Sequence, residues 1–203
     1  MNKDRIDHNI ILSIVGEGTR VLDVGCADGK LLHMLERKKN ISGQGIEIEH
    51  DKVEICLQKG LSVVEGDANR EITYFPKNSF DYVVLSQTLQ TVQKPKIVLG
   101  EILRVGKKAI ISFPNFGHWL CRFQIGIFGK MPVTKDLKLP WFDTQNIHLC
   151  TIKDFEALTK SMMFKIEKGY GINRNKKIMK SFFSLYYMNI FASHAVFLIS
   201  KKS

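Results

Sequence analysis

At 203 residues the chain is long enough to bury one substantial core and too short for two comfortable ones, so we expect a single domain over residues 1–203. Its 44% apolar and 25% charged residues are ordinary for a globular protein and exclude a disordered chain or a disulfide scaffold. The formal net charge of +10 is spread along the chain and concentrated at 165–180, which favours a lysine-rich solvated surface and does not alone indicate nucleic-acid binding.

The cysteines and the first residues bear on the compartment. The cysteines form no C-x-x-C pair and fall in separate predicted elements: Cys26, Cys56, Cys121 and Cys150. Free thiols in a reducing compartment fit this distribution. Residues 1–15 carry early charges and only a short apolar run, which does not match a signal peptide. We therefore expect a cytoplasmic protein.

One uncharged stretch, residues 181–200, is long enough to be tested as a membrane span. Several polar side chains interrupt it, and near Phe191 its spacing changes from helical to β-rich. We therefore predict a helix followed by a core strand, and no membrane partner.

The remaining elements follow in chain order. The apolar spacing predicts helix 7–15, strand 21–24, helix 30–38, strand 41–48, helix 51–59, strands 61–64 and 80–85, helix 95–105, strand 109–113, helix 152–163, and strands 164–170 and 192–199. Strands that alternate with helices imply right-handed crossovers. The predicted fold class is α/β: a doubly wound, mostly parallel seven-stranded sheet with helices on both faces, the last strand antiparallel.

An irregular excursion interrupts this pattern after the fifth strand. Residues 115–151 carry aromatic side chains among scattered Gly, Pro and Lys. Such a long irregular segment is usually a lid, a substrate wall or a partner surface. We therefore divide the domain into a cofactor-binding half at 1–113, this lid or partner excursion at 114–151, and a closing helix and strands at 152–203.

The turn after the first predicted strand is typical of a cofactor site. The apolar run 21–24 is broken only by Asp23 and ends at Gly25. A buried strand that ends in a small-residue turn points the first amides of the next helix outward. Gly25 and Gly29 are four residues apart with Ala27 between them, so the turn does not match the G-x-G-x-x-G of a dinucleotide fold.

Acidic and small residues follow the next three strands. Glu47 lies near the end of the second strand, Asp67 and Ala68 follow the third, and Ser86 opens the turn after the fourth. Ligands collect at the carboxyl ends of strands in open α/β sheets, so we expect these residues to share a site with the first turn. Each alone is most often an ordinary loop residue, and their occurrence at successive strand ends is what indicates binding.

The string D-x-G-x-A-x-G at 23–29 resembles the first motif of class I S-adenosylmethionine-dependent methyltransferases. The resemblance implies a Rossmann-like fold that binds S-adenosylmethionine or S-adenosylhomocysteine. It places the backbone of Gly25 and Cys26 against the cofactor and Asp23 near the charged aminoacyl end. Ala27 is a departure, because the family often has glycine there, and its methyl group narrows the turn.

The same resemblance assigns the later strand ends. Glu47 would take both ribose hydroxyls, a bidentate task that suits a carboxylate. Asp67 and Ala68 would lie beside the adenine, where a carboxylate can accept the exocyclic amine. The predicted cofactor-binding residues are Asp23, Gly25, Cys26, Gly29, Glu47, Asp67, Ala68 and Ser86.

No catalytic residue can be assigned. Ser86-Gln87-Thr88 stands where amino-group nucleic-acid methyltransferases have N-P-P-Y or D-P-P-Y. His148 is either a base at the mouth of the site or, more often in such loops, a hydrogen-bonded histidine. His118-x-x-Cys121 and His148-x-Cys150 do not have the spacing of a usual zinc site, so we predict no metal.

Longer strings resemble the methionine biosynthesis protein MetW family. They are V-L-D-V-G-C-A-D-G at 21–29, V-L-S-Q-T-L-Q at 84–90, S-F-P-N-F-G-H-W at 112–119, G-K-M-P-V-T at 129–134 and N-I-H-L-C-T-I-K-D-F at 146–155. This resemblance implies a role in methionine synthesis as the accessory or regulatory partner of homoserine O-acyltransferase. Two alternatives remain: a methyltransferase of an unidentified small molecule with the excursion as its lid, and RNA methylation driven by the basic tail, although no RNA module accompanies that charge.

Overall fold

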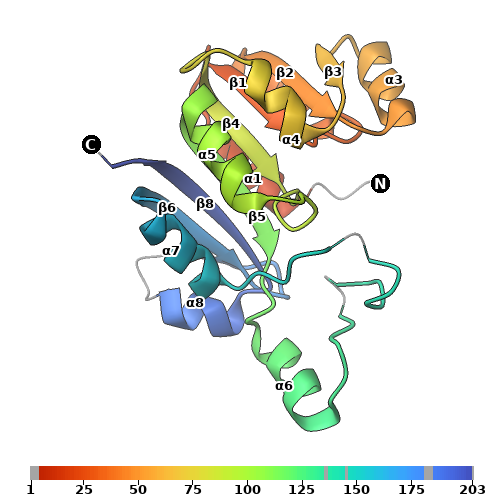
Figure 1. The fold of residues 1–203 in the computed structure, drawn as a ribbon, viewed down its shortest axis with the longest axis vertical. Helices are drawn as coiled ribbons and strands as arrows, with labels where there is room; N and C mark the ends of the chain where they lie inside the picture. The colour runs from red at the N-terminus through yellow and green to blue at the C-terminus, as the bar shows by residue number, and fades with distance from the viewer. Residues whose placement is uncertain (1–4, 135–136, 145, 181–184, 203) are drawn as a thin grey trace.

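The computed structural model describes residues 5–134, 137–144, 146–180 and 185–202. Its strands are β1 (Arg20–Val24), β2 (Ser42–Glu47), β3 (Val63–Glu65), β4 (Phe80–Ser86), β5 (Gly106–Pro114), β6 (Phe164–Ile172), β7 (Ile178–Lys180) and β8 (His194–Lys201). They form one sheet in the order β3-β2-β1-β4-β5-β8-β6-β7 (Figure 1). The predicted α/β class is confirmed.

The first five strands are parallel, and the strand order reverses beside β1. Asp23 of β1 pairs with Gly45 of β2 on one side and Val84 of β4 on the other. β8 runs antiparallel to both β5 and β6, which confirms the predicted antiparallel last strand. The carboxyl ends of β1 to β4 therefore meet at one edge of the sheet.

The prediction of seven strands is wrong by one, because the described sheet has eight. The additional strand, β7, pairs antiparallel with β6 after a turn in which Lys176 has a left-handed φ of 63°. Three residues are too few to show a period of two, and β7 ends in a lysine on an edge where it needs no apolar face. The sequence therefore carried no strand signal there.

Helices cover both faces of the sheet, as predicted. They are α1 (Ile6–Ile14), α2 (Lys30–Lys39), α3 (His50–Gln58), α4 (Ala68–Glu71), α5 (Pro95–Val105), α6 (Trp119–Phe128), α7 (Ile152–Ser161) and α8 (Leu185–Phe191). Alternation along β1 divides the core into two clusters: Leu22 belongs to the one that includes residues of α5, α7 and α8, and Val21 to the one that includes residues of α1 and α2. Thr151 and Asp154 form a capping box that fixes the start of α7.

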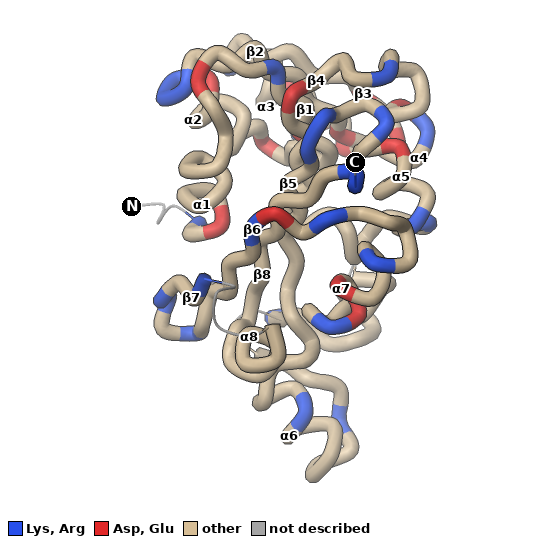
Figure 2. Tube along the Cα trace, turned by 90° about the vertical axis from the view of Figure 1, so that its left-hand side faces the viewer, with Lys and Arg blue, Asp and Glu red and all other residues tan. Residues whose placement is uncertain are grey.

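Helix α6 projects beyond the sheet at the beginning of the excursion (Figure 1). Apart from Arg122 and Gln124 its residues are apolar, yet Cys121 is its one fully buried residue. Figure 2 shows few charges on α6, whereas basic residues gather at the turn between β6 and β7. The absence of an apolar stripe explains why the sequence predicted an irregular segment and no helix here.

The helix and strand predicted within residues 181–200 are present as α8 and β8, while residues 181–184 lie outside the described part. No helix among the described residues has the length and apolar character needed to cross a bilayer.

Candidate functional site

A cleft of about 590 Å³ opens at the carboxyl ends of β1 to β4. Five of the eight predicted residues line it: Gly25, Glu47, Asp67, Ala68 and Ser86. These residues are far apart in the sequence, but the parallel strands bring them together at the same edge of the sheet.

Gly25 brings the backbone of the first turn to the surface of the cleft. Its φ is +73°, and its N–H and that of Cys26 both donate to the carbonyl of Ile46, at 2.8 and 3.1 Å. A Cβ at Gly25 would lie 2.7 Å from the side chain of Thr88, which also lines the cleft. Glycine is therefore required both for the left-handed conformation and for the close approach.

Glu47 fastens the turn to the end of β2. Its buried carboxylate accepts the N–H groups of Ala27 at 2.7 Å, Ile48 at 2.8 Å and Glu49 at 3.0 Å. A carboxylate has about four acceptor positions, so contacts with ribose hydroxyls would share these oxygens with three amides. Ala27 has a φ of 49°, so the residue that departs from the family pattern adopts the conformation that glycine favours.

Asp67 lies on the wall of the cleft, after the end of β3. It caps α4, where its carboxylate accepts from the backbone N–H of Asn69 at 2.9 Å and from Asn69 Nδ2 at 2.7 Å. Asn69 also lines the cleft, and within the described part of the chain its buried Oδ1 has no hydrogen-bond partner. Asn69 was not predicted from the sequence. Its signal is its position two residues after Asp67, because a carboxylate at the N-cap accepts the backbone N–H of the second or third helical residue.

Asp23 lies beneath the cleft and does not line it. The side chain is 1% exposed, and its Oδ1 has no hydrogen-bond partner among the residues that the structure describes. Burial raises the pKa of Asp23 to about 7, the positive charge of Arg5 opposes that rise, and the negative charge of Glu47 adds to it. A cationic ligand nearby would favour the ionised form of this buried carboxyl group.

Cys26 and Gly29 shape the turn from below. Cys26 is buried against Gly45, where an added Cβ would lie 2.6 Å from its Sγ, and burial raises the pKa of its thiol. Gly29 begins α2 with a φ of +70°, and a Cβ there would lie 2.3 Å from Leu61. Both residues are packing elements of the turn, and they do not line the cleft itself.

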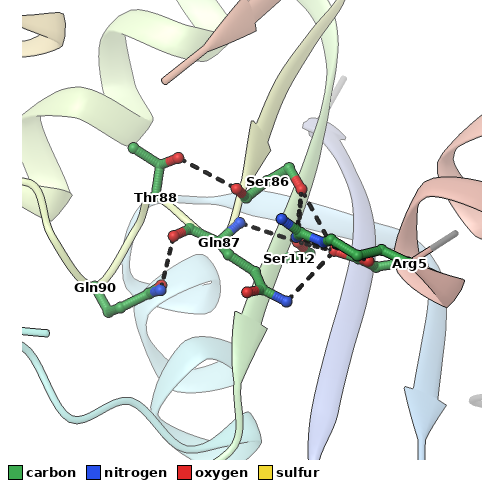
Figure 3. Close-up of polar contacts among 7 residues, drawn as sticks. Arg5, Ser86, Gln87, Thr88, Gln90 and Ser112 are labelled. Carbon is green, nitrogen blue, oxygen red and sulfur yellow. Dashed lines mark hydrogen bonds and ion pairs between the residues drawn. The ribbon is translucent and has the colours of Figure 1, made fainter. Parts of the chain in front are cut away.

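The first turn of α1 contributes a polar cluster that the sequence analysis did not identify (Figure 3). Asp7 is 4% exposed and binds the guanidinium of Arg5 through Nε, at 3.1 Å, and Nη2. Asp7 Oδ2 also lies 3.4 Å from the hydroxyls of Ser86 and Ser112. Burial opposes ionisation of Asp7, but the hydrogen bond and charge of Arg5 hold its pKa below the ordinary value.

A second cavity of about 740 Å³ adjoins the cleft, and Gln87 and Thr91 line both. Its outer wall comes from the excursion, including Trp141. Gln90 lines this cavity, and its Nε2 donates to the carbonyl of Gln87 at 2.7 Å. Its buried Oε1 has no hydrogen-bond partner in the described ranges. The backbone carbonyl of Gln90 accepts the N–H groups of Ile147 and His148, so it holds the returning limb of the excursion.

The candidate base and metal ligands do not assemble into one cluster among the described residues. His148 is exposed, lines neither cavity, and its Nε2 lies 3.4 Å from the carbonyl of Gln93, which fits the hydrogen-bonded loop histidine. His118 caps α6 by accepting the N–H of Leu120. In the part of the chain that the structure describes, no three His, Cys, Asp or Glu side chains come together as a metal site.

Comparison with protein families places these features in context. The family model described as methionine biosynthesis protein MetW matches residues 5–199. A relative from Rhodopirellula baltica, described as a bifunctional methionine biosynthesis protein MetXA/MetW, is 32% identical over 172 residues. The match covers 80% of this chain but only 28% of that relative.

Solved structures share the fold at low sequence identity. A methyltransferase of Thermotoga maritima, described as a possible histamine N-methyltransferase, superposes with a TM-score of 0.70 at 16% identity, over 97% of this chain and 88% of its own. Phosphoethanolamine N-methyltransferase 2 of Haemonchus contortus, in complex with S-adenosyl-L-methionine, gives 0.69 at 16% identity, over 97% and 52%. These similarities establish the methyltransferase fold.

Proposed function

Since this chain belongs to the family of the methionine biosynthesis protein MetW, we propose that it binds S-adenosylmethionine or S-adenosylhomocysteine and acts as an accessory partner of homoserine O-acyltransferase. The chemistry of the cleft supports the first part. Gly25 offers backbone at close approach, and among the described residues Asn69 Oδ1 near Asp67 and Asp23 Oδ1 below the cleft have no hydrogen-bond partner. These groups suit an S-adenosyl nucleoside with an exocyclic amine at one end and an ammonium group at the other.

The observation that carries the partner role is the apolar surface of the excursion. We use the name excursion surface for α6 together with residues 137–144. Its exposed side chains include Trp119, Phe123, Ile127, Phe128, Trp141 and Phe142. Phe128 is 61% exposed and Trp141 71%. Exposed aromatic side chains, such as Trp and Phe, are enriched at protein interfaces.

The composition of the Rhodopirellula relative supports the identity of the partner. Its name joins MetXA and MetW in one chain, of which the region similar to this protein is a minor part. We take MetXA to be the homoserine acyltransferase. Fusion holds two modules at high effective concentration, which is useful when the separate modules act together.

Co-purification with homoserine O-acyltransferase, and assay of that enzyme with and without this protein, tests the proposal. We expect a complex and a changed acyltransferase rate, both lost in Phe128→Asp. The matched control is Leu57→Asp on α3, which places the same charge at a side chain that is also exposed and apolar. No complex and an unchanged rate with the wild-type protein would contradict the accessory role.

The second cavity favours the alternative function of a small-molecule methyltransferase. It adjoins the cleft through Gln87 and Thr91, where an acceptor could reach the cofactor, and the excursion would then be its lid. Incubation with isotopically methyl-labelled S-adenosylmethionine and fractionated metabolites tests this reading. Transfer of label to one defined acceptor, lost with the cofactor competitor S-adenosylhomocysteine, would support it over the accessory role.

A further inference from the structure

We propose that the second cavity, between the end of β4 and the excursion, binds an uncharged, mostly apolar or aromatic small molecule that carries an N–H or O–H donor. Gln90 supplies the polar contact of this site. The inference needs neither the S-adenosyl ligand nor the acyltransferase of the proposed function, and it names the chemistry of the ligand whether or not that ligand is methylated.

The side-chain amide of Gln90 is fixed in one orientation. Its nitrogen lies 2.7 Å from the backbone carbonyl of Gln87, and since a carbonyl only accepts hydrogen bonds, the group that faces it is the NH2 end of the amide (Figure 3). The backbone of Gln90 is held as well, because its carbonyl accepts the N–H groups of Ile147 and His148 at 3.0 and 3.1 Å. The amide oxygen is therefore an acceptor at a fixed position, and turning the amide over would break its bond to Gln87.

This amide oxygen is buried and lacks a donor. Gln90 is 5% exposed and lines the cavity, and its Oε1 accepts no hydrogen bond from the described part of the chain. A buried acceptor without a donor costs free energy, which a hydrogen bond from a ligand would remove. A ligand with no donor would leave the oxygen unpaired, so the cavity should select for an N–H or O–H group.

The other lining residues suit a molecule that is mostly apolar and uncharged. The cavity has a volume of about 740 Å³, which is within the usual range of small-molecule sites. Phe116, Leu137 and Trp141 contribute apolar walls. Among the described lining residues, Lys138 and Asp143 carry the charges, one of each sign, so the lining has no net charge that would favour an anion or a cation.

An ordered water molecule on Gln90 Oε1 is the competing account. Water would satisfy the oxygen by itself, and the cavity would then not select ligands by their donor. Indole and benzofuran separate the two accounts, because they share the fused-ring shape and differ in one group, the N–H of indole and the ring oxygen of benzofuran. Their ratio of dissociation constants therefore isolates the hydrogen bond.

Ligand-observed NMR titration of the full chain with both compounds tests the inference. We expect indole to bind with a Kd of about 1 mM or below, and about 5- to 100-fold more tightly than benzofuran. Gln90→Met removes the acceptor and keeps a side chain of similar length, so the ratio should fall to about one. The matched control is Gln93→Met, the same change at an exposed glutamine that lines neither cavity, and it should leave the ratio unchanged.

The two tryptophans of the chain report where indole binds. In isotope-labelled protein, indole should shift the side-chain N–H signal of Trp141, which lines the cavity, and not that of Trp119 on α6. The signal that is lost in Trp141→Phe identifies the first of these. No binding of indole, a shift confined to Trp119, or a wild-type ratio near one overturns the inference, and none of these results needs a Gln90 variant to fold. An unchanged ratio in folded Gln90→Met overturns it as well.

Discussion

The buried carboxyl group of Asp23 makes a strong prediction about stability. Its pKa rises from 3.8 to about 7 because the folded chain removes it from water. The unfolded chain releases this proton above pH 4, whereas the native state keeps it until about pH 7. The native state therefore binds more protons in this window, and the stability associated with Asp23 is lost as the pH rises through it.

The magnitude follows from the two pKa values. At about 1.4 kcal/mol for each pH unit, the contribution lost from Asp23 reaches ~4 kcal/mol above pH 7. Asp23→Asn removes the ionisable group and keeps its size. We expect the free energy of unfolding of the variant, relative to wild type, to rise by ~2–3 kcal/mol from pH 5 to pH 7.5. Any fixed cost of burying the amide is the same at both pH values and cancels.

Urea unfolding followed by circular dichroism at several pH values measures this difference. Asp81→Asn is the control of opposite sign, because the N–H of Arg20 and the ammonium of Lys107 hold the pKa of Asp81 below its ordinary value. The ionised Asp81 stabilises the fold above the pKa that this group has in the unfolded chain. Asp81→Asn should therefore have a lower free energy of unfolding than wild type at neutral pH. A difference between Asp23→Asn and wild type that stays constant from pH 5 to 7.5 would refute the reasoning.

Three further substitutions test the site and the core. His8→Asn should flatten the loss of stability on acidification from pH 6.5 to 4, because burial lowers the pKa of His8 to about 4, and pH-dependent unfolding measures the slope. Gly25→Ala should abolish nucleotide binding in titration calorimetry and cost ~1–2 kcal/mol or more, because its Cβ would contact Thr88 in a left-handed backbone. Phe155→Ala should cost ~3–5 kcal/mol in urea unfolding with little effect on nucleotide affinity, because Phe155 stacks on Phe197 at 5.1 Å in the core.

The residues at the strand ends were accessible to sequence analysis for a simple physical reason. Parallel strands in a doubly wound sheet bring their carboxyl ends to one edge, so residues 20 or more positions apart become neighbours once the strands are recognised. Glu47 and Asp67 were found in this way and line the same cleft. The strand pattern did not show which residues of the first turn face the cleft. Cys26 and Gly29 were predicted to do so, but they are packed beneath the turn.

The polar cluster of α1 could not be found from local patterns alone. Asp7 contacts Ser86 and Ser112, which are 79 and 105 residues away, and no helical or strand period reports such pairs. A signal was nevertheless present. Asp7 stands three and seven residues before Ile10 and Ile14, so it falls on the apolar stripe of α1. A carboxylate on a buried stripe needs a charged partner, which here is Arg5.

The two cavities offer the proposed accessory role a physical route to regulation by the S-adenosyl ligand. Gln87 and Thr91 line both cavities, and the carbonyl of Gln90 between them holds Ile147 and His148 of the excursion. If a nucleotide in the cleft changes the arrangement of this segment, it changes the excursion surface as well. Linkage then requires the acyltransferase to change nucleotide affinity by the same factor. Surface plasmon resonance of the complex with and without S-adenosylmethionine measures the coupling, for which we expect ~5- to 150-fold. Equal affinities would show that the nucleotide and the partner bind independently, and the cleft would then have no sensing role.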